Sequence, residues 1–266
     1  MPSGRVETDN PESIGLRNAG ALSRPAAMGV SLLFAPPSRP SVPDIEALLS
    51  VGEHSAPTAR ISYRPPDEEG WLELLASGLT FNISGLSPAI GAAPMAVQHV
   101  YGFAHQPELD GLEAIGLVPS DHIAGGGTMP PVVRTLVGLA TALSLQLPVT
   151  AIAWHSAGTV MEPGYFTRIV TSWLSGGAFP ALGLAALVSA ADGSITSHGL
   201  EVFCGQEFQL EAGQNGASAD SVKLALRVAD HLVRRGPVKS PTSIEGTALL
   251  AEPSQVGKLV WIWRQD

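Results

Sequence analysis

The segment around Ser156 has the residue types of a hydrolase nucleophile. It reads WHSAG over 154–158 and differs from the Gly-x-Ser-x-Gly nucleophile elbow at its first position. In an α/β-hydrolase this motif forms a tight turn between a strand and a helix, and the turn presents the serine hydroxyl as the attacking group. An apolar run over 149–154 precedes the serine, and the upstream stretch HIAGGG over 122–127 is similar to a glycine-rich oxyanion loop. Ser156 is therefore a candidate catalytic nucleophile.

Two neighbouring features weigh against this hydrolase hypothesis. The residue two positions before an elbow serine must be small, because a bulky side chain there collides with the neighbouring backbone, and Trp154 is the largest residue available. The elbow serine also opens a helix, whereas Pro163 and Gly164 interrupt any helix within two turns of Ser156. We therefore expect Ser156 to cap a turn and Trp154 to fill core, and we keep a serine hydrolase as the alternative.

A serine of this kind also needs an acid and then a histidine later in the chain. Asp192 with His198 has this order, and so has Asp220 with His231. The second pair lies on one predicted helix, where eleven residues separate the side chains by about 16 Å at 1.5 Å per residue. The candidate triad is therefore Ser156, His198 and Asp192.

Seven histidines suggest a metal site, but their spacing does not support one. No two of them lie at i, i+4 on a predicted helix, and no HExxH pattern occurs. The single cysteine, Cys204, excludes a thiolate zinc cluster, and neither a GxxxxGK(S/T) phosphate loop nor a GxGxxG motif after a strand is present. We expect no metal and no cofactor, and a solvated or capping role for Glu162, Glu201 and Glu207. The histidines are His54, His99, His105, His122, His155, His198 and His231.

The composition excludes several classes of partner. The 266 residues carry 15 Lys and Arg against 24 Asp and Glu, which gives a formal net charge of −9. No basic cluster is long enough to follow a phosphate backbone, so neither nucleic-acid binding nor attachment to anionic lipid is expected. No run of 18 apolar residues predicts a membrane span. The single cysteine fits a cytoplasmic protein, and the partners that remain are another protein or a small ligand.

The elements that must position these residues indicate an α+β fold, a mainly antiparallel sheet with helices packed on one face. The stretch 94–103 predicts a short helix, 107–120 a loop with one helical turn, and 122–125 a strand. For residues 71–75, a helix remains the alternative to the first strand of a hairpin. The predicted strands are 29–34, 59–63, the hairpin 71–76 with 79–84, 149–154, 182–189, 207–211 and 258–263, and the predicted helices are 43–49, 129–146, 165–174 and 218–235.

The chain is predicted to begin with a disordered extension over 1–27. This segment is rich in Pro, Gly, Ser, Asn and charge and lacks the apolar core of a secretory signal. A change of composition predicts a boundary near residue 120, with one α+β lobe over 28–120 and a second over 121–266. Their similar make-up leaves open a duplication, and we expect both lobes to form one compact unit.

Three segments in order resemble a bacterial family called domain of unknown function 4261. They are AIAWHSAGTVMEPGYF over 151–166, DGSITSHGLEVFCGQEFQLEA over 192–212 and ALRVADHLVRRGPV over 225–238. The likeness is strongest over 149–250, and the stretch KSPTSIEG over 239–246 departs from the polar Asp-Gly-Asp turn that such proteins often carry. Because the family has no established activity, the resemblance implies only the fold and a bacterial protein, with a structural aromatic residue at Trp154.

The leading hypothesis is a non-enzymatic, cytoplasmic binding domain. Trp261 and Trp263 are candidates for a partner surface, because large exposed apolar side chains mark interaction sites. The same two residues can instead alternate across the last strand and place one indole in the core. The alternative function is the serine hydrolase that uses Ser156.

Overall fold

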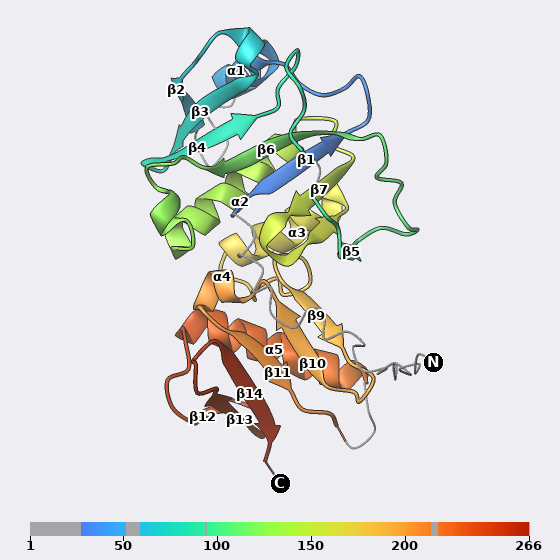
Figure 1. Cartoon of the computed structure of the whole chain (residues 1–266), viewed down its shortest axis with the longest axis vertical. Helices are drawn as coiled ribbons and strands as arrows, with labels where there is room; N and C mark the ends of the chain where they lie inside the picture. Colours follow the sequence, from blue (N-terminus) through green and yellow to red (C-terminus); the bar gives the residue numbers. More distant parts are fainter. Residues whose placement is uncertain (1–27, 52–58, 94, 214–217, 266) are drawn as a thin grey trace, which may run out of the picture.

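The computed structural model describes residues 28–51, 59–93, 95–213 and 218–265. Its strands form two sheets, one above the other along the long axis of the molecule (Figure 1). Both sheets are mixed and mostly antiparallel, so the predicted α+β class with a mainly antiparallel sheet is confirmed. The predicted disordered segment 1–27 lies outside the described residues.

The first sheet has the strand order β2-β3-β4-β6-β1-β7-β8-β5. Its central strand β1 pairs antiparallel with β6 on one side and with β7 on the other, whereas β5 pairs parallel with β8. At the β3–β4 turn, Ser77 and Gly78 both have positive φ, as the predicted two-residue hairpin requires. The strands are β1 (Val30–Phe34), β2 (Ala59–Tyr63), β3 (Trp71–Ala76), β4 (Leu79–Ser84), β5 (His99–Tyr101), β6 (Glu113–Pro119), β7 (Ala151–Trp154) and β8 (Thr159–Met161).

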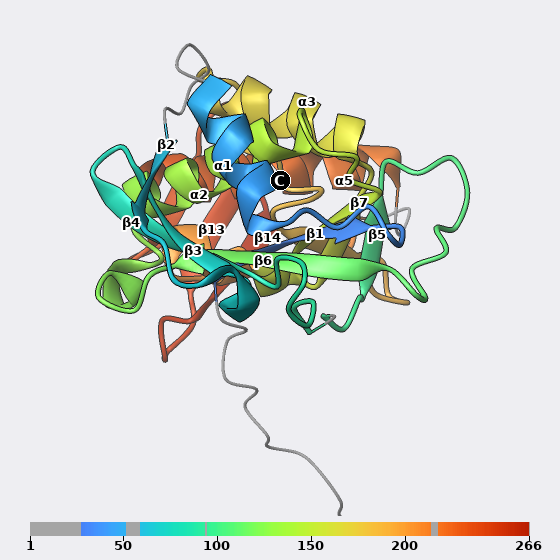
Figure 2. The same cartoon turned by 90° about the horizontal axis from the view of Figure 1, so that it is seen from above.

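Three helices cover one face of this sheet: α1 (Val42–Val51), α2 (Pro130–Ser144) and α3 (Pro163–Leu174) (Figure 2). At the start of α3, the Glu162 carboxylate accepts hydrogen bonds from the backbone N–H groups of Gly164 and Tyr165, and Pro163 occupies the first turn. Proline is favoured there because the first backbone N–H groups of a helix have no partner within the helix. The Pro163-Gly164 pair therefore begins the helix, and Glu162 has the capping role that was expected.

The opposite face of the first sheet packs against the connection between β4 and β6. A small core of Leu33, Ala114, Ala151, Ala153 and Val160 lies there, and partly buried apolar residues between 92 and 112 pack on it. From here on, the first lobe means the first sheet with α1, α2 and α3, and the second lobe means the second sheet with its helices. Three short 3-10 helices of the described residues belong to the first lobe: η1 (Asp67–Glu69), η2 (Ala124–Gly126) and η3 (His155–Ala157). The predicted strand 122–125 is wrong, because η2 and the turn before it occupy this stretch.

The second sheet has the order β12-β13-β14-β11-β10-β9. Helix α5 (Ala219–Arg235) packs on one of its faces through Ala225, Val228, Ala229 and Leu232, which are all buried. Ser218 caps α5, because its hydroxyl accepts a hydrogen bond from the backbone N–H of Ser221. The remaining elements are α4 (Glu201–Cys204), β9 (Ala186–Ser189), β10 (Ile195–His198), β11 (Glu207–Leu210), β12 (Thr242–Ile244), β13 (Leu249–Pro253) and β14 (Leu259–Arg264).

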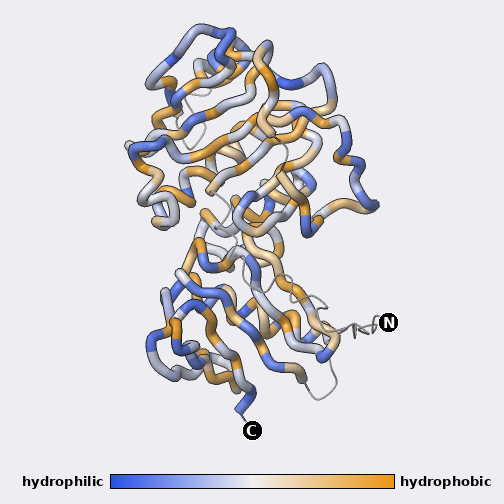
Figure 3. The backbone as a smooth tube through the Cα atoms, viewed as in Figure 1, coloured by the Kyte–Doolittle hydropathy of each residue, from blue (hydrophilic) through white to orange (hydrophobic). Residues whose placement is uncertain are grey.

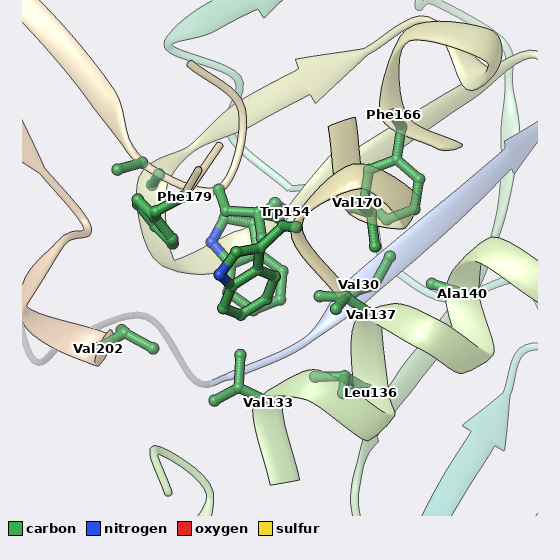
Figure 4. Close-up of a cluster of buried hydrophobic side chains, with 14 of the residues drawn as sticks. Val30, Val133, Leu136, Val137, Ala140, Trp154, Phe166, Val170, Phe179 and Val202 are labelled. Carbon is green, nitrogen blue, oxygen red and sulfur yellow. The ribbon is translucent and has the colours of Figure 1, made fainter. Parts of the chain in front are cut away.

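One continuous hydrophobic core joins the two sheets. Phe203 of α4 stacks on Trp154 of β7 with ring centroids 6.0 Å apart, and it meets Phe179 at 4.6 Å and Trp173 of α3 at 6.0 Å. Figure 4 shows Trp154 and Phe179 between Val202 and the side chains of the first lobe. The most hydrophilic parts of the chain lie at outer turns and loops (Figure 3). The expected core position of Trp154 is thus confirmed.

Two stretches of the first lobe differ from their predicted structure. The predicted helix over 94–103 contains the short strand β5, and the predicted loop over 107–120 contains β6, the neighbour of the central strand β1. The first sheet therefore takes strands from both sides of residue 120, up to β8 at Met161. The two sheets divide the chain between β8 and β9.

Candidate functional site

Ser156 lies in a tight connection between two strands of the same sheet. Strand β7 ends at Trp154, η3 follows, and Gly158 at φ 61° turns the chain into the antiparallel strand β8. A nucleophile elbow leads from a strand into a helix, so this connection lacks its geometry. The Ser156 hydroxyl is buried, and it has no hydrogen-bond partner among the residues that the structure describes. No described base is therefore placed to activate it.

The neighbouring residue, His155, is a structural histidine. Its Nε2 lies 2.8 Å from the Ser31 hydroxyl of β1, and its backbone N–H donates to the Gly29 carbonyl at 3.0 Å. Burial lowers the pKa of His155, because the charged imidazolium loses its hydration in the core. His155 therefore holds the β7–β8 connection against the central strand. It does not act as a base for Ser156.

The other two members of the candidate triad lie at opposite ends of β10. Asp192 is in the turn before the strand, where its carboxylate accepts hydrogen bonds from the backbone N–H and the hydroxyl of Ser194. These two hydrogen bonds lower the pKa of Asp192. His198 is the last residue of β10, at the end that faces the first lobe. Asp192 therefore does not orient His198, and the three candidates do not form a relay.

His198 instead contacts His99, which was considered from the sequence only as one of seven histidines without the spacing of a metal site. The rings of His99 in β5 and His198 are 6.0 Å apart at their centroids and lie edge to face. The next residue, Gly199, lies against η3, where an added Cβ would be 2.7 Å from the Ala157 Cβ and 2.8 Å from the Ser156 carbonyl oxygen. The contact between the His99 and His198 rings joins the first lobe to the second, and we call it the histidine junction.

Two other residues considered from the sequence, Glu207 and Cys204, have structural roles. Glu207 accepts hydrogen bonds from the Ser197 hydroxyl and the Glu201 backbone N–H, while burial raises its pKa. Burial also raises the pKa of the Cys204 thiol to about 11, so this thiol stays protonated at neutral pH. Within the described ranges, no group of three or more His, Cys, Asp and Glu residues could hold a metal ion.

A second candidate site lies on the face of the second sheet that α5 does not cover. Val260 and Ile262 of β14 are buried under α5, so the alternate residues Trp261 and Trp263 project from the opposite face. Their rings are stacked, with centroids 6.1 Å apart, and Trp263 is 39% exposed. In Figure 1 the strands β10, β11 and β14 lie in front of α5 on this open side. Neither indole enters the core, although alternation had left that possibility open.

Polar side chains surround the two indoles. Strand register places five residues side by side across five strands of this face: Val188, Thr196, Gln209, Trp261 and Glu252. A cavity of about 220 Å³ opens beside the indoles, and its charged lining residues are Asp192 and Glu211. We call this surface the tryptophan face: Trp261, Trp263, Gln209, Asp192, Glu211 and Glu252.

The carboxylates of the tryptophan face are available to a ligand. Glu211 accepts a hydrogen bond from the Arg264 backbone N–H, and Glu252 accepts one from the Trp263 indole N–H at 3.0 Å. Within the described part of the chain, neither these two acids nor Asp192 forms an ion pair. The sequence indicated both tryptophans, and Asp192 only as a member of the triad; Glu211 and Glu252 were missed, since the three acids come from different parts of the chain.

Comparisons with protein families, with curated proteins and with solved structures find no match to this chain. Across the described ranges, no helix combines the length and the apolar character needed to cross a membrane.

The buried hydroxyl of Ser156 predicts the outcome of a labelling experiment. We expect a fluorophosphonate probe to leave Ser156 unmodified, because the probe needs an accessible serine oxygen that a base has activated. Mass spectrometry of the digested protein measures this, with Ser156→Ala as the matched control. Modification at Ser156 that disappears in the control would restore the serine hydrolase hypothesis.

Proposed function

We propose that this protein is a non-enzymatic binding protein that captures a positively charged segment of another protein on the tryptophan face. The observation that carries the proposal is the position of Trp261 and Trp263, both on the open face of the sheet and beside three carboxylates. An exposed group of apolar side chains with polar residues around it is typical of an interaction site. The candidate triad offers no comparable arrangement, so catalysis through Ser156 is not part of this proposal.

The chemistry of the face favours a cationic partner. The face of an indole ring attracts a guanidinium or ammonium group by about 0.5–2 kcal/mol, and the attraction is larger where water is excluded. Asp192 and Glu211 line the cavity beside the rings, and each can accept hydrogen bonds from such a group. The formal net charge of −9 adds a long-range attraction for a positive partner. Arginine fits best, because it stacks on aromatic rings and hydrogen-bonds to carboxylates at once.

The wider setting is part of the same proposal. We propose a cytoplasmic protein of bacterial origin, related over 149–250 to domain of unknown function 4261. The single buried Cys204 and the resemblance of the three segments support these assignments. A partner protein would then be found in the same compartment.

A peptide titration tests the proposed binding. We expect a short peptide of alternating arginine and glycine to bind the purified protein and change its tryptophan fluorescence, while the glutamate–glycine counterpart does not bind. Trp261→Ala or Trp263→Ala should weaken binding roughly tenfold, because each removes an aromatic contact at the centre of the surface. Asp192→Asn combined with Glu211→Gln should weaken binding and reduce its dependence on salt.

The matched control for the tryptophan variants is Trp71→Ala. Trp71 is a half-buried residue of β3 in the other lobe, and its indole N–H also donates to a carboxylate, that of Glu69. This variant should bind the arginine peptide as the natural protein does. Equal binding of both peptides, or equal losses in Trp71→Ala and Trp261→Ala, would contradict the proposal. Binding of free arginine as tightly as of the peptide would assign the face to a small cation instead.

A further inference from the structure

The histidine junction joins an edge strand of the first sheet to the end of a strand in the second. His99 lies in β5, a three-residue strand that pairs only with β8 in the described sheet, and His198 ends β10 beside Ala186 of β9. The edge-to-face contact of their rings bridges two segments that belong to different sheets. A charge on either ring would therefore lie at a contact between the two lobes.

The surroundings favour the neutral form of His99. Its Nε2 is buried and has no hydrogen-bond partner among the described residues. Burial lowers the pKa of His99, and repulsion from a charged His198 lowers it further. Two imidazolium rings at this separation would repel each other across the junction, whereas two neutral rings attract through their edge-to-face contact.

No described anionic partner offsets this repulsion. From β8, the residue paired with His99 is the neutral Thr159, whose hydroxyl donates to the Gly183 carbonyl. From β5 and α3, Tyr101 and Tyr165 face each other, and burial raises the pKa of both hydroxyls, so they stay uncharged.

The second lobe supplies two carboxyl groups near the end of β10. Glu207 of β11 is already held by the Ser197 hydroxyl and the Glu201 backbone N–H, and Glu201 lies in the first turn of α4. Neither carboxylate forms an ion pair with His99 or His198 in the described structure.

We propose that the histidine junction is a pH-sensitive contact: the two lobes are held together there while both rings are neutral, and protonation on acidification opens the junction locally. His99 is half-buried and His198 is exposed, so opening exposes chiefly the buried Nε2 of His99 to water, where the ring takes up a proton near its ordinary pKa of 6.5. The open form therefore binds protons more readily than the closed form. Its population rises as pH falls below 6.5 and is lowest above that value.

Hydrogen exchange of backbone amides tests this proposal without reference to any ligand. Protection of the amides in β5 and β10, corrected for the intrinsic pH dependence of exchange, should be compared at pH 7.5 and pH 5.5. We expect it to fall at the lower pH by up to about tenfold per pH unit for each proton taken up. The amides of β1, which lies in the centre of the first sheet, should lose much less protection.

Two variants separate the junction from other histidines. His99→Gln should abolish most of the acid-dependent loss in β5, because burial of His99 is the larger cause of its lowered pKa, whereas His122→Gln should keep the loss, because the His122 ring contacts Thr80 in the first lobe. His155 is also buried, but its partner Ser31 lies in β1, so protonation of His155 would appear in β1 and β7. No acid-dependent loss in β5 and β10, or an equal loss in His99→Gln, would overturn the proposal.

Discussion

Replacing Trp154 with alanine is expected to lower the free energy of unfolding by about 3–5 kcal/mol, the range for deleting a large aromatic side chain from a core. Trp154 is fully buried, and its ring stacks on Phe203 at the place where the two sheets share their core. Val30, Val133 and Phe179 lie around it, from three further segments of the chain (Figure 4). The loss should therefore affect the attachment of the lobes and the first sheet together. Urea unfolding followed by circular dichroism measures the change.

Two further variants define what the Trp154 result means. Trp71→Ala removes the same side chain from a half-buried position in β3 and should cost much less. Trp154→Phe should also cost less than alanine, because it keeps an aromatic ring and removes an indole N–H that has no partner in the described structure. If Trp154→Ala were no more harmful than Trp71→Ala, Trp154 would not have the structural role assigned to it.

Replacing Gly199 with alanine is expected to destabilise the protein by at least about 2 kcal/mol. Two effects add: the left-handed backbone, at φ +77°, costs a side chain about 1–2 kcal/mol, and overpacking costs about 1–3 kcal/mol. The new Cβ would lie 2.7 Å from the Cβ and 2.8 Å from the Cα of Ala157, so η3 and the segment that follows β10 would have to move apart. Thermal or urea unfolding measures the loss.

Gly205→Ala is the matched control for Gly199→Ala. Gly205 also has a left-handed backbone, at φ +80°, but a Cβ added there would meet nothing within 4 Å. It should therefore show the backbone cost alone, and the difference between the two variants measures how closely the lobes approach each other. Equal losses of stability would mean that the structure around Gly199 and Ala157 accommodates the new Cβ without a cost in free energy.

The sequence predicted elements well where apolar residues recur regularly along one face of a strand or helix. The hairpin of β3 and β4 and the amphipathic helices α2, α3 and α5 follow their apolar patterns closely. It failed for β6, because this strand lies beside the central strand, is buried on both faces and contains Gly116, so no alternation marks it. It also failed for β5, where three residues pair with a parallel strand distant in the sequence.

The two candidate sites were predictable to different degrees. The size of Trp154, too large for an elbow, correctly predicted a core residue, and Trp261 and Trp263 were selected as large apolar side chains expected at the surface. The contact between His99 and His198 has no local signal, because it depends on how two sheets pack. The same holds for Asp192 and Glu211, which approach the indoles only once the strand order of the second sheet is fixed.

The central position of β1 has a consequence for folding during synthesis. This strand leaves the ribosome before any of its neighbours, yet it needs β6 and β7 on its two sides, and the Ser31–His155 contact closes a loop of 124 residues. Contacts this distant in sequence form slowly, since the entropy of closing the loop is lost before they are gained. The apolar strand VSLLF therefore lacks β6 until residue 119 has been made and β7 until residue 154 has been made. A nascent chain that stops before β7 would be prone to aggregate, and a chaperone that binds extended apolar segments would find its target in this strand.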